Sequence, residues 1–298
     1  MNLAKNYTDM VKLLSCILIA THHYAGQCVC NGDEKMIWRI MTNYGGVAGV
    51  AIFFFLSGYG LMKSELVRHL NLKEFFWKRI VKLYLPTILV GGITCLIWAT
   101  VFHTQYTILS LISSILFLNS DMVFWFLKVL MVWYAVFYVF IAVRHRAETL
   151  APFLLIAFGI AITCGEYCIE DPLHSINAGW FAVGVLSAHP CRKSVVIITS
   201  IMASGGVIYL LHSPNSHLFI HALCGLAAVA TVLLLAKLRL AFVFPAFLKD
   251  LSYDIYLVHG KVNHLTYLTN GQLWYVTYLS LVIVTALLFH FVRRVCKM

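Results

Sequence analysis

Near its start the chain reads Asp9-Met-Val-Lys-Leu-Leu-Ser-Cys-Ile-Leu-Ile-Ala-Thr-His-His-Tyr24, a stretch apolar enough to enter a lipid bilayer. Lys12 and His23 interrupt this apolar stretch. At about 100° and about 1.5 Å per residue, a helix places both groups on nearly the same face, roughly 16 Å apart. Ionisable groups inside a membrane are costly and usually functional, so the segment predicts both a membrane helix and a site.

The whole chain has the composition of a polytopic membrane protein. Of its 298 residues, 61% are hydrophobic and 11% are charged, whereas a soluble domain has about 25% charged residues. Ten apolar stretches are long enough to span roughly 30 Å of hydrocarbon, although the sixth is short. These predicted spans are residues 8–27, 43–63, 80–102, 122–143, 151–169, 176–189, 194–212, 217–236, 248–267 and 272–293. We therefore expect an all-α integral membrane protein with a single domain over residues 1–298, and a re-entrant or interfacial helix within 106–119.

The distribution of cations supports this topology. A net charge of +10 alone could indicate a nucleic-acid partner, but in a membrane protein the positions of the charges matter more than their number. With the N-terminus in the cytoplasm, ten spans place 17 Lys and Arg residues inside and two outside, and leave Lys12, Lys128 and Lys261 within spans. The positive-inside rule thus predicts cytoplasmic N- and C-termini and no nucleic-acid partner. The cytoplasmic segment 63–82 interleaves apolar and basic residues, as expected of a helix lying in the membrane interface.

Four sequence signatures follow one another along the chain. They are Phe53-Phe-Phe-Leu-Ser-Gly-Tyr-Gly-Leu61, Phe75-Phe-Trp-Lys-Arg-Ile-Val-Lys-Leu-Tyr-Leu-Pro86, Trp125-Phe-Leu127 and Leu251-Ser-Tyr-Asp-Ile-Tyr-Leu-Val-His259. In this order, and within a frame of ten spans, they resemble the membrane acyltransferase-3 family. This family consists of integral-membrane O-acyltransferases that modify bacterial surface glycans. The resemblance covers nearly the whole chain.

The resemblance implies catalytic roles near the N-terminus. The family's opening motif is an aspartate, then an arginine three residues later, then a histidine after ten intervening residues. Asp9, Lys12 and His23 occupy these positions here, which implies that Lys12 and His23 are catalytic and that Asp9 contacts the substrate or orients these groups. Lys12 departs from the family, which has an arginine at this position. Lysine lacks the planar fork of arginine and loses its proton more readily when desolvated.

The resemblance also implies residues for the donor and the acceptor. The family's basic cluster at the start of the third span falls on Lys78, Arg79 and Lys82, which together with Ser57 would bind an acyl-coenzyme A. The family's late element places Tyr256 and His259 as residues that contact the acceptor or orient the base. The residues alone are equally consistent with His259 bridging helices with Asp254 or Lys261, and with Tyr256 as a packing group with a polar tip. Gly58 and Gly60 are expected to allow close contact between helices.

The chemistry of these residues is consistent with acyl transfer. Moving an acyl group from a thioester to a hydroxyl requires a base, and imidazole has an unperturbed pKa of about 6.5. On the predicted topology Lys12 lies near the cytoplasm and His23 lies beyond the midplane. Acyl-coenzyme A could therefore place its phosphates against Lys12 and Arg79 while its arm carries the thioester to His23. Direct transfer and an acyl-histidine intermediate both remain open.

These observations predict an O-acetyltransferase, multi-pass in the bacterial inner membrane. It would use cytoplasmic acetyl-CoA and modify a hydroxyl of a surface or lipid-linked glycan at the outer face. The sequence has no His-Glu-x-x-His set, no Gly-x-x-x-x-Gly-Lys loop and no Gly-x-Ser-x-Gly elbow, so no metal is expected. One alternative is a proton-coupled transporter or exporter that uses the ionisable groups within its spans as a relay. Another is a catalytically reduced family member that serves as a partner or sensor.

Overall fold

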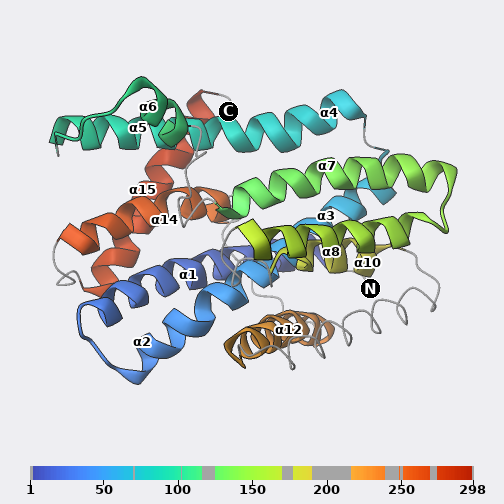
Figure 1. Ribbon diagram of the computed structural model, residues 1–298, viewed down its shortest axis with the longest axis horizontal. Helices are drawn as coiled ribbons and strands as arrows, with labels where there is room; N and C mark the ends of the chain where they lie inside the picture. Colours follow the sequence, from blue (N-terminus) through green and yellow to red (C-terminus); the bar gives the residue numbers. More distant parts are fainter. Residues whose placement is uncertain are drawn as a thin grey trace.

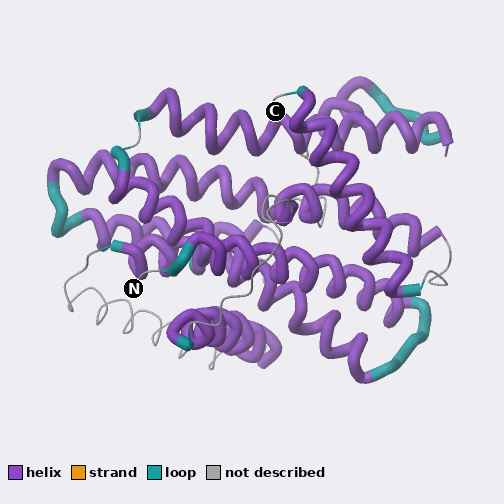
Figure 2. Tube along the Cα trace, turned by 180° about the vertical axis from the view of Figure 1, so that it is seen from behind, coloured by secondary structure: helices purple, strands orange, loops and turns teal. Residues whose placement is uncertain are grey.

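A computed structural model describes residues 3–69, 71–101, 103–115, 125–169, 177–189, 216–238, 248, 251–268 and 274–296. Within these ranges the regular structure is entirely helical, which confirms the predicted all-α class (Figures 1 and 2). The first part of the chain forms α1 (Lys5–Cys30), α2 (Met36–Ile40), a π-helical turn (Met41–Gly45), α3 (Gly46–Val67), α4 (Leu72–Phe76), a second π-helical turn (Trp77–Val81) and α5 (Lys82–Val101). The remainder forms α6 (Ile108–Ile115), α7 (Trp125–Arg146), α8 (Ala151–Ile169), α10 (Trp180–Ala188), α12 (Ser216–Lys237), α14 (Leu251–Leu268) and α15 (Tyr275–Val295).

Among the described residues, six helices are long and apolar enough to cross a membrane. They are Lys5–Cys30, Met36–Val67, Lys73–Val101, Trp125–Arg146, Ile220–Lys237 and Tyr275–Val295. Each coincides with a predicted span. Helices α8, α10 and α14 also fall on predicted spans, whereas the predicted span 194–212 lies outside the described residues. Ten spans and cytoplasmic termini therefore stay predictions.

The segment 106–119 contains only a short helix in its described part. Helix α6 has eight residues and packs on α5. At about 1.5 Å per residue such a helix is too short to cross a bilayer.

The expected interfacial helix over residues 63–82 does not form as one element. Helix α3 continues to Val67, and a new helix begins at Leu72 and runs in line through α4 into α5 (Figure 1). Phe75 is buried with its ring against those of Tyr134, Phe137 and Tyr138 on α7. The adjacent Phe76 and Trp77 are exposed, so only part of the apolar surface of this segment packs on the bundle.

Helices α3 and α10 approach each other closely at two glycines. A Cβ atom on Gly58 would overlap the carbonyl group of Phe181, and one on Gly184 would overlap the carbonyl group of Phe55. The expectation of close helix contact is confirmed for Gly58. It is wrong for Gly60, where a Cβ atom would meet open space.

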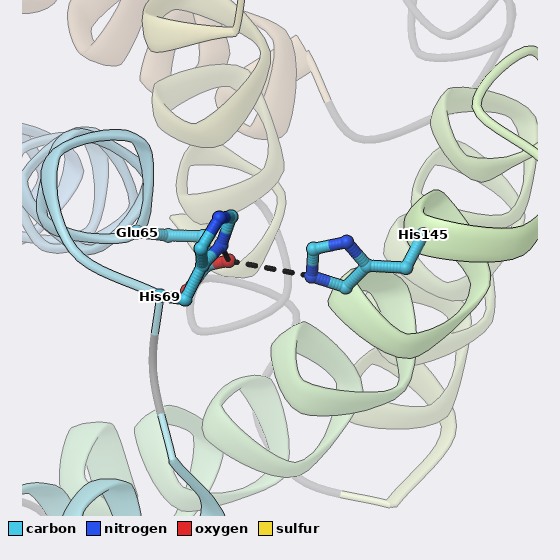
Figure 3. A group of neighbouring side chains, drawn as sticks. All are labelled: Glu65, His69 and His145. Carbon is cyan, nitrogen blue, oxygen red and sulfur yellow. Dashed lines mark hydrogen bonds and ion pairs between the residues drawn. The ribbon is translucent and has the colours of Figure 1, made fainter.

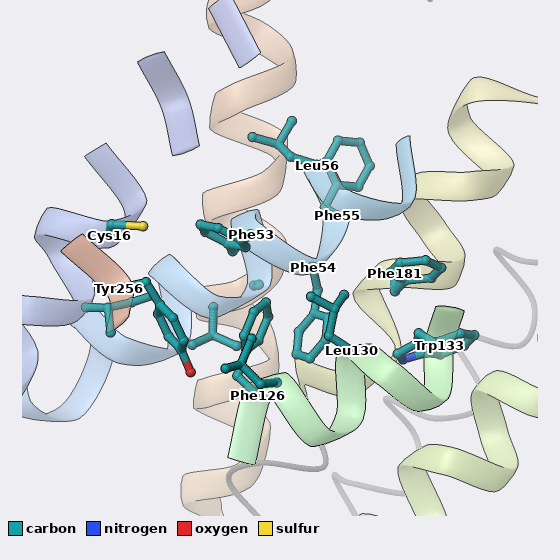
Figure 4. Close-up of a cluster of buried hydrophobic side chains, with 14 of the residues drawn as sticks. Cys16, Phe53, Phe54, Phe55, Leu56, Phe126, Leu130, Trp133, Phe181 and Tyr256 are labelled. Atoms are coloured by element: carbon teal, nitrogen blue, oxygen red, sulfur yellow. The ribbon is translucent and has the colours of Figure 1, made fainter. Parts of the chain in front are cut away.

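An aromatic cluster fills the space between α3, α7, α10 and α14 (Figure 4). The ring of Phe126 lies 4.4 Å from that of Phe54 and 5.4 Å from that of Tyr256, between centroids. Further along α7, Trp133 stacks on Phe181 at 5.0 Å, and its indole N–H donates to the carbonyl oxygen of Ala178, just before α10. This packing fixes α14, and with it the histidine at position 259, against the rest of the bundle.

Candidate active site

Two histidines from distant parts of the sequence lie side by side in the bundle. Helices α1 and α14 pack together, and the ring centroids of His23 and His259 are 5.2 Å apart. The His259 side chain is fully buried, and that of His23 is partly buried. The structure therefore joins the predicted base to the last residue of the late signature.

The tautomer of His259 follows from its backbone contact. Its Nδ1 atom lies 2.6 Å from the carbonyl oxygen of Tyr256. A carbonyl oxygen can only accept a hydrogen bond, so Nδ1 carries the proton and Nε2 is the basic nitrogen of the neutral ring. This contact also fixes the plane of the imidazole.

The neighbouring His22 has a different role. Its Nδ1 atom lies 3.2 Å from the carbonyl oxygen of Met41, at the start of the first π-helical turn. A Cβ atom on Gly46 would lie 2.8 Å from the His22 ring. His22 therefore packs α1 against the start of α3, and it provides a neighbouring imidazole with which the role of His23 can be compared.

Tyr256 lies within the aromatic cluster described above. Its ring centroid is 5.5 Å from that of His259 and 6.3 Å from that of Phe53 (Figure 4). The side chain is almost completely buried. This placement gives Tyr256 a packing role beside the histidine pair, and its carbonyl group anchors His259.

The predicted donor-side cations come together from two elements. Lys12 is partly buried on α1, where the charges of Asp9 and Arg79 both act on it. Arg79 belongs to the second π-helical turn, is also partly buried, and acts on the buried Tyr134 of α7. Asp9 precedes Lys12 by three residues, which places the carboxylate and the ammonium on one side of the helix. The charge of Lys5 acts on Lys12 as well, so three cations with one carboxylate among them suit an anionic ligand.

The other predicted donor-binding residues are less well placed. Lys78 forms an ion pair with Glu74, one helical turn earlier, and Glu74 also binds Arg68 at 3.0 Å. The hydroxyl group of Ser57 donates to the carbonyl oxygen of Phe53 at 2.7 Å, within its own helix. The side chain of Lys82 lies outside the described part of the structure. Arg79 is thus the strongest candidate of the basic cluster.

A buried ionic cluster that the sequence did not reveal joins α14 to α15. The Oδ2 atom of Asp254 accepts from Nδ1 of His290 at 2.6 Å and from the Arg293 guanidinium at 3.0 Å. The Asp254 side chain is fully buried. The spacing of His290 and Arg293, one turn apart on the last helix, was the available signal. Asp254 therefore bridges helices through these two residues.

The helices and the buried histidine pair together define a multi-pass membrane protein with a polar centre inside an apolar bundle. A family model described as an acyltransferase domain matches residues 5–262. The chain belongs to this family, the acyltransferase-3 family, and is a membrane acyltransferase, as the sequence signatures indicated. Searches of curated proteins and of solved structures gave no significant match. The matched region includes both histidines of the pair as well as Lys12 and Arg79.

Proposed function

We propose that the protein is an O-acetyltransferase of the bacterial inner membrane. It would take the acetyl group from cytoplasmic acetyl-CoA and deliver it to a hydroxyl of a surface or lipid-linked glycan at the outer face. The observation that carries this proposal is the contact between His23 and His259, 5.2 Å apart between ring centroids, inside an acyltransferase domain. The pair places a base in a water-poor part of the bundle.

The reaction needs one proton to move from the acceptor to the leaving thiolate. In direct transfer, His23 takes the hydroxyl proton as the oxygen attacks the thioester carbonyl carbon. The carbon–sulfur bond then breaks, and His23 returns the proton to the sulfur of coenzyme A. In the two-step route, a nitrogen of His23 attacks the thioester carbon, the carbon–sulfur bond breaks, and the thiol of coenzyme A leaves with the proton lost from the ring. The acceptor hydroxyl then attacks the carbonyl carbon of the acyl-imidazole and returns a proton to the ring as the carbon–nitrogen bond breaks. In either route His259, held by the Tyr256 carbonyl, orients His23 or the acceptor.

The donor would bind through its phosphates at the other end of the first helix. Lys12 and Arg79 act on each other electrostatically, so a polyanion between them would relieve their mutual repulsion. Lys78, Lys82 and Ser57 would contribute at the edge of this site. Asp9 would hold the ammonium of Lys12 in position.

The histidine proposal is tested by acetyl transfer from radiolabelled acetyl-CoA. Membranes containing the protein are incubated with the labelled donor and the envelope glycan fraction, and label in the glycan is counted. We expect His23→Ala to reduce incorporation by about 10²- to 10⁴-fold, the usual contribution of a general base. His22→Gln, which keeps a donor for the Met41 carbonyl, is the control and should retain most activity.

The same assay separates the alternatives. A transporter would leave the acetyl group on coenzyme A, and a catalytically reduced member would transfer none in any variant. Acceptor-free incubation distinguishes the two chemical routes, because only an acyl-histidine leaves label on the protein. Wild-type incorporation by His23→Ala would overturn the assignment of the base.

A further inference from the structure

We propose that Glu65, His69 and His145 form a binding site for Zn²⁺, separate from the histidine pair. Glu65 lies in the last turn of α3, His69 follows the end of that helix, and His145 lies in the last turn of α7 (Figure 3). The three side chains converge, and their ligand atoms all lie within 4.8 Å of one another. Two imidazoles and a carboxylate are a donor set that zinc uses in proteins.

The distances fit coordination to a common ion. The Oε1 atom of Glu65 is 3.3 Å from Nδ1 of His69 and 3.5 Å from Nε2 of His145. Zinc binds nitrogen and oxygen at about 2.0–2.2 Å, so two ligand atoms of a tetrahedral site are about 3.3–3.5 Å apart. Both distances match this separation between two zinc ligands, and both are long for charge-assisted hydrogen bonds. The two imidazole nitrogens lie within 4.8 Å of each other and would need to approach by up to about 1.4 Å to complete the triangle.

The burial of the three side chains is also suitable for binding a metal ion. The Glu65 side chain is fully buried, whereas those of His69 and His145 are 85% and 50% exposed. A buried carboxylate is stabilised by a metal ion that places positive charge against it. The exposed imidazoles leave the outer side of the cluster open, so the ion could enter and keep water as a fourth ligand.

The position of the cluster suggests what the ion would do. It would link the end of α3 to the end of α7 and hold the chain that leads into α4 at Leu72. That chain continues to the π-helical turn with Arg79, so the metal would order the approach to the proposed donor site. The ligands come from two segments far apart in the chain and form no contiguous metal motif, which is why the sequence motifs predicted no metal.

The test measures metal binding directly. The purified full-length protein in detergent is stripped with a chelator and titrated with Zn²⁺ by calorimetry, and separately with Co²⁺, whose visible absorption reports tetrahedral nitrogen and oxygen ligands. We expect one ion per chain, and loss of the binding isotherm in His69→Ala and in His145→Ala. His103→Asn removes an exposed imidazole outside the cluster and should bind as the wild type does.

A second variant separates metal binding from simple hydrogen bonding. Glu65→Gln keeps the shape of the side chain and can still bond to an imidazole, but a neutral amide is a poor zinc ligand. We expect Zn²⁺ to raise the unfolding midpoint of the wild type and to leave that of Glu65→Gln unchanged, since only a bound ligand stabilises the folded state. Equal Zn²⁺ binding by the wild type and His145→Ala, or none by the wild type, would overturn the site.

Discussion

Lys12 is the residue at which this chain departs from the opening motif of its family. Its ammonium lies within the electrostatic influence of Asp9 and Arg79, in a partly buried position. An arginine there could bind a phosphate through two parallel N–H donors and would stay charged when desolvated. A lysine at this position would bind a phosphate with fewer fixed donors than the family's arginine.

We predict that Lys12→Arg retains or improves activity. The planar fork should lower the KM for acetyl-CoA, while kcat changes little because the residue is remote from the reacting atoms. Steady-state kinetics with radiolabelled donor measures both constants. Lys237→Arg is the matched control, since it makes the same change at an exposed position in the last turn of α12, away from Lys12. Complete inactivity of Lys12→Arg would show that the site requires an amine.

The candidate site residues follow from motif positions in the sequence, but the residues that they contact do not. The spacing that selects Lys12 and His23 depends only on helix geometry, and α1 is indeed one uninterrupted helix. The contact of His23 with His259 joins residues far apart in the chain and depends on how α1 and α14 pack. Asp254 illustrates the same limit. It precedes His259 by five residues, about 140° around the helix, and its carboxylate binds His290 and Arg293 on α15.

At the scale of the helices, the length of an apolar stretch predicted where a membrane helix lies, whereas an amphipathic pattern did not predict what the segment packs against. Stretches of about 20 apolar residues define membrane helices whatever their neighbours are. An alternating apolar and basic segment such as 63–82 can lie on a membrane or pack on a helix, and the sequence does not separate the two. In the second half of this segment the structure buries Phe75 against α7 and leaves Phe76 and Trp77 exposed.

The two glycines of the second span give a matched pair for testing helix packing. We predict that Gly58→Ala destabilises the protein by about 1–3 kcal/mol, because the new methyl group must displace the backbone of α10. Gly60→Ala meets open space and should be neutral or slightly stabilising, since alanine favours a helix. Unfolding midpoints in detergent compare the two variants. Equal destabilisation would mean that α3 and α10 do not cross at Gly58.

At the scale of the whole molecule, the distribution of cations is the strongest evidence for topology. Six candidate spans are seen among the described residues, and the proposed chemistry needs the donor and acceptor sides to be opposite. Lys12 and His23 lie eleven residues apart on one helix, about 16 Å along its axis. A half-membrane separation of this size suits a thin ligand arm that enters from the cytoplasm and reaches an acceptor at the outer side.

The natural cysteines provide a test of this topology. Cys30 ends α1 and Cys296 follows α15, and both side chains are exposed. With ten spans and a cytoplasmic N-terminus, nine crossings separate the two residues, so they lie on opposite sides. We predict that a membrane-impermeant maleimide added to intact spheroplasts labels Cys30 and labels Cys296 only after permeabilisation, as read by mass spectrometry of the peptides. Cys30→Ser and Cys296→Ser each remove one signal and confirm its origin.

Labelling of both cysteines from the same side would require an even number of crossings between them and would exclude the ten-span arrangement. Labelling of Cys296 alone from outside would invert the topology, and with it the assignment of Lys12 to the donor side.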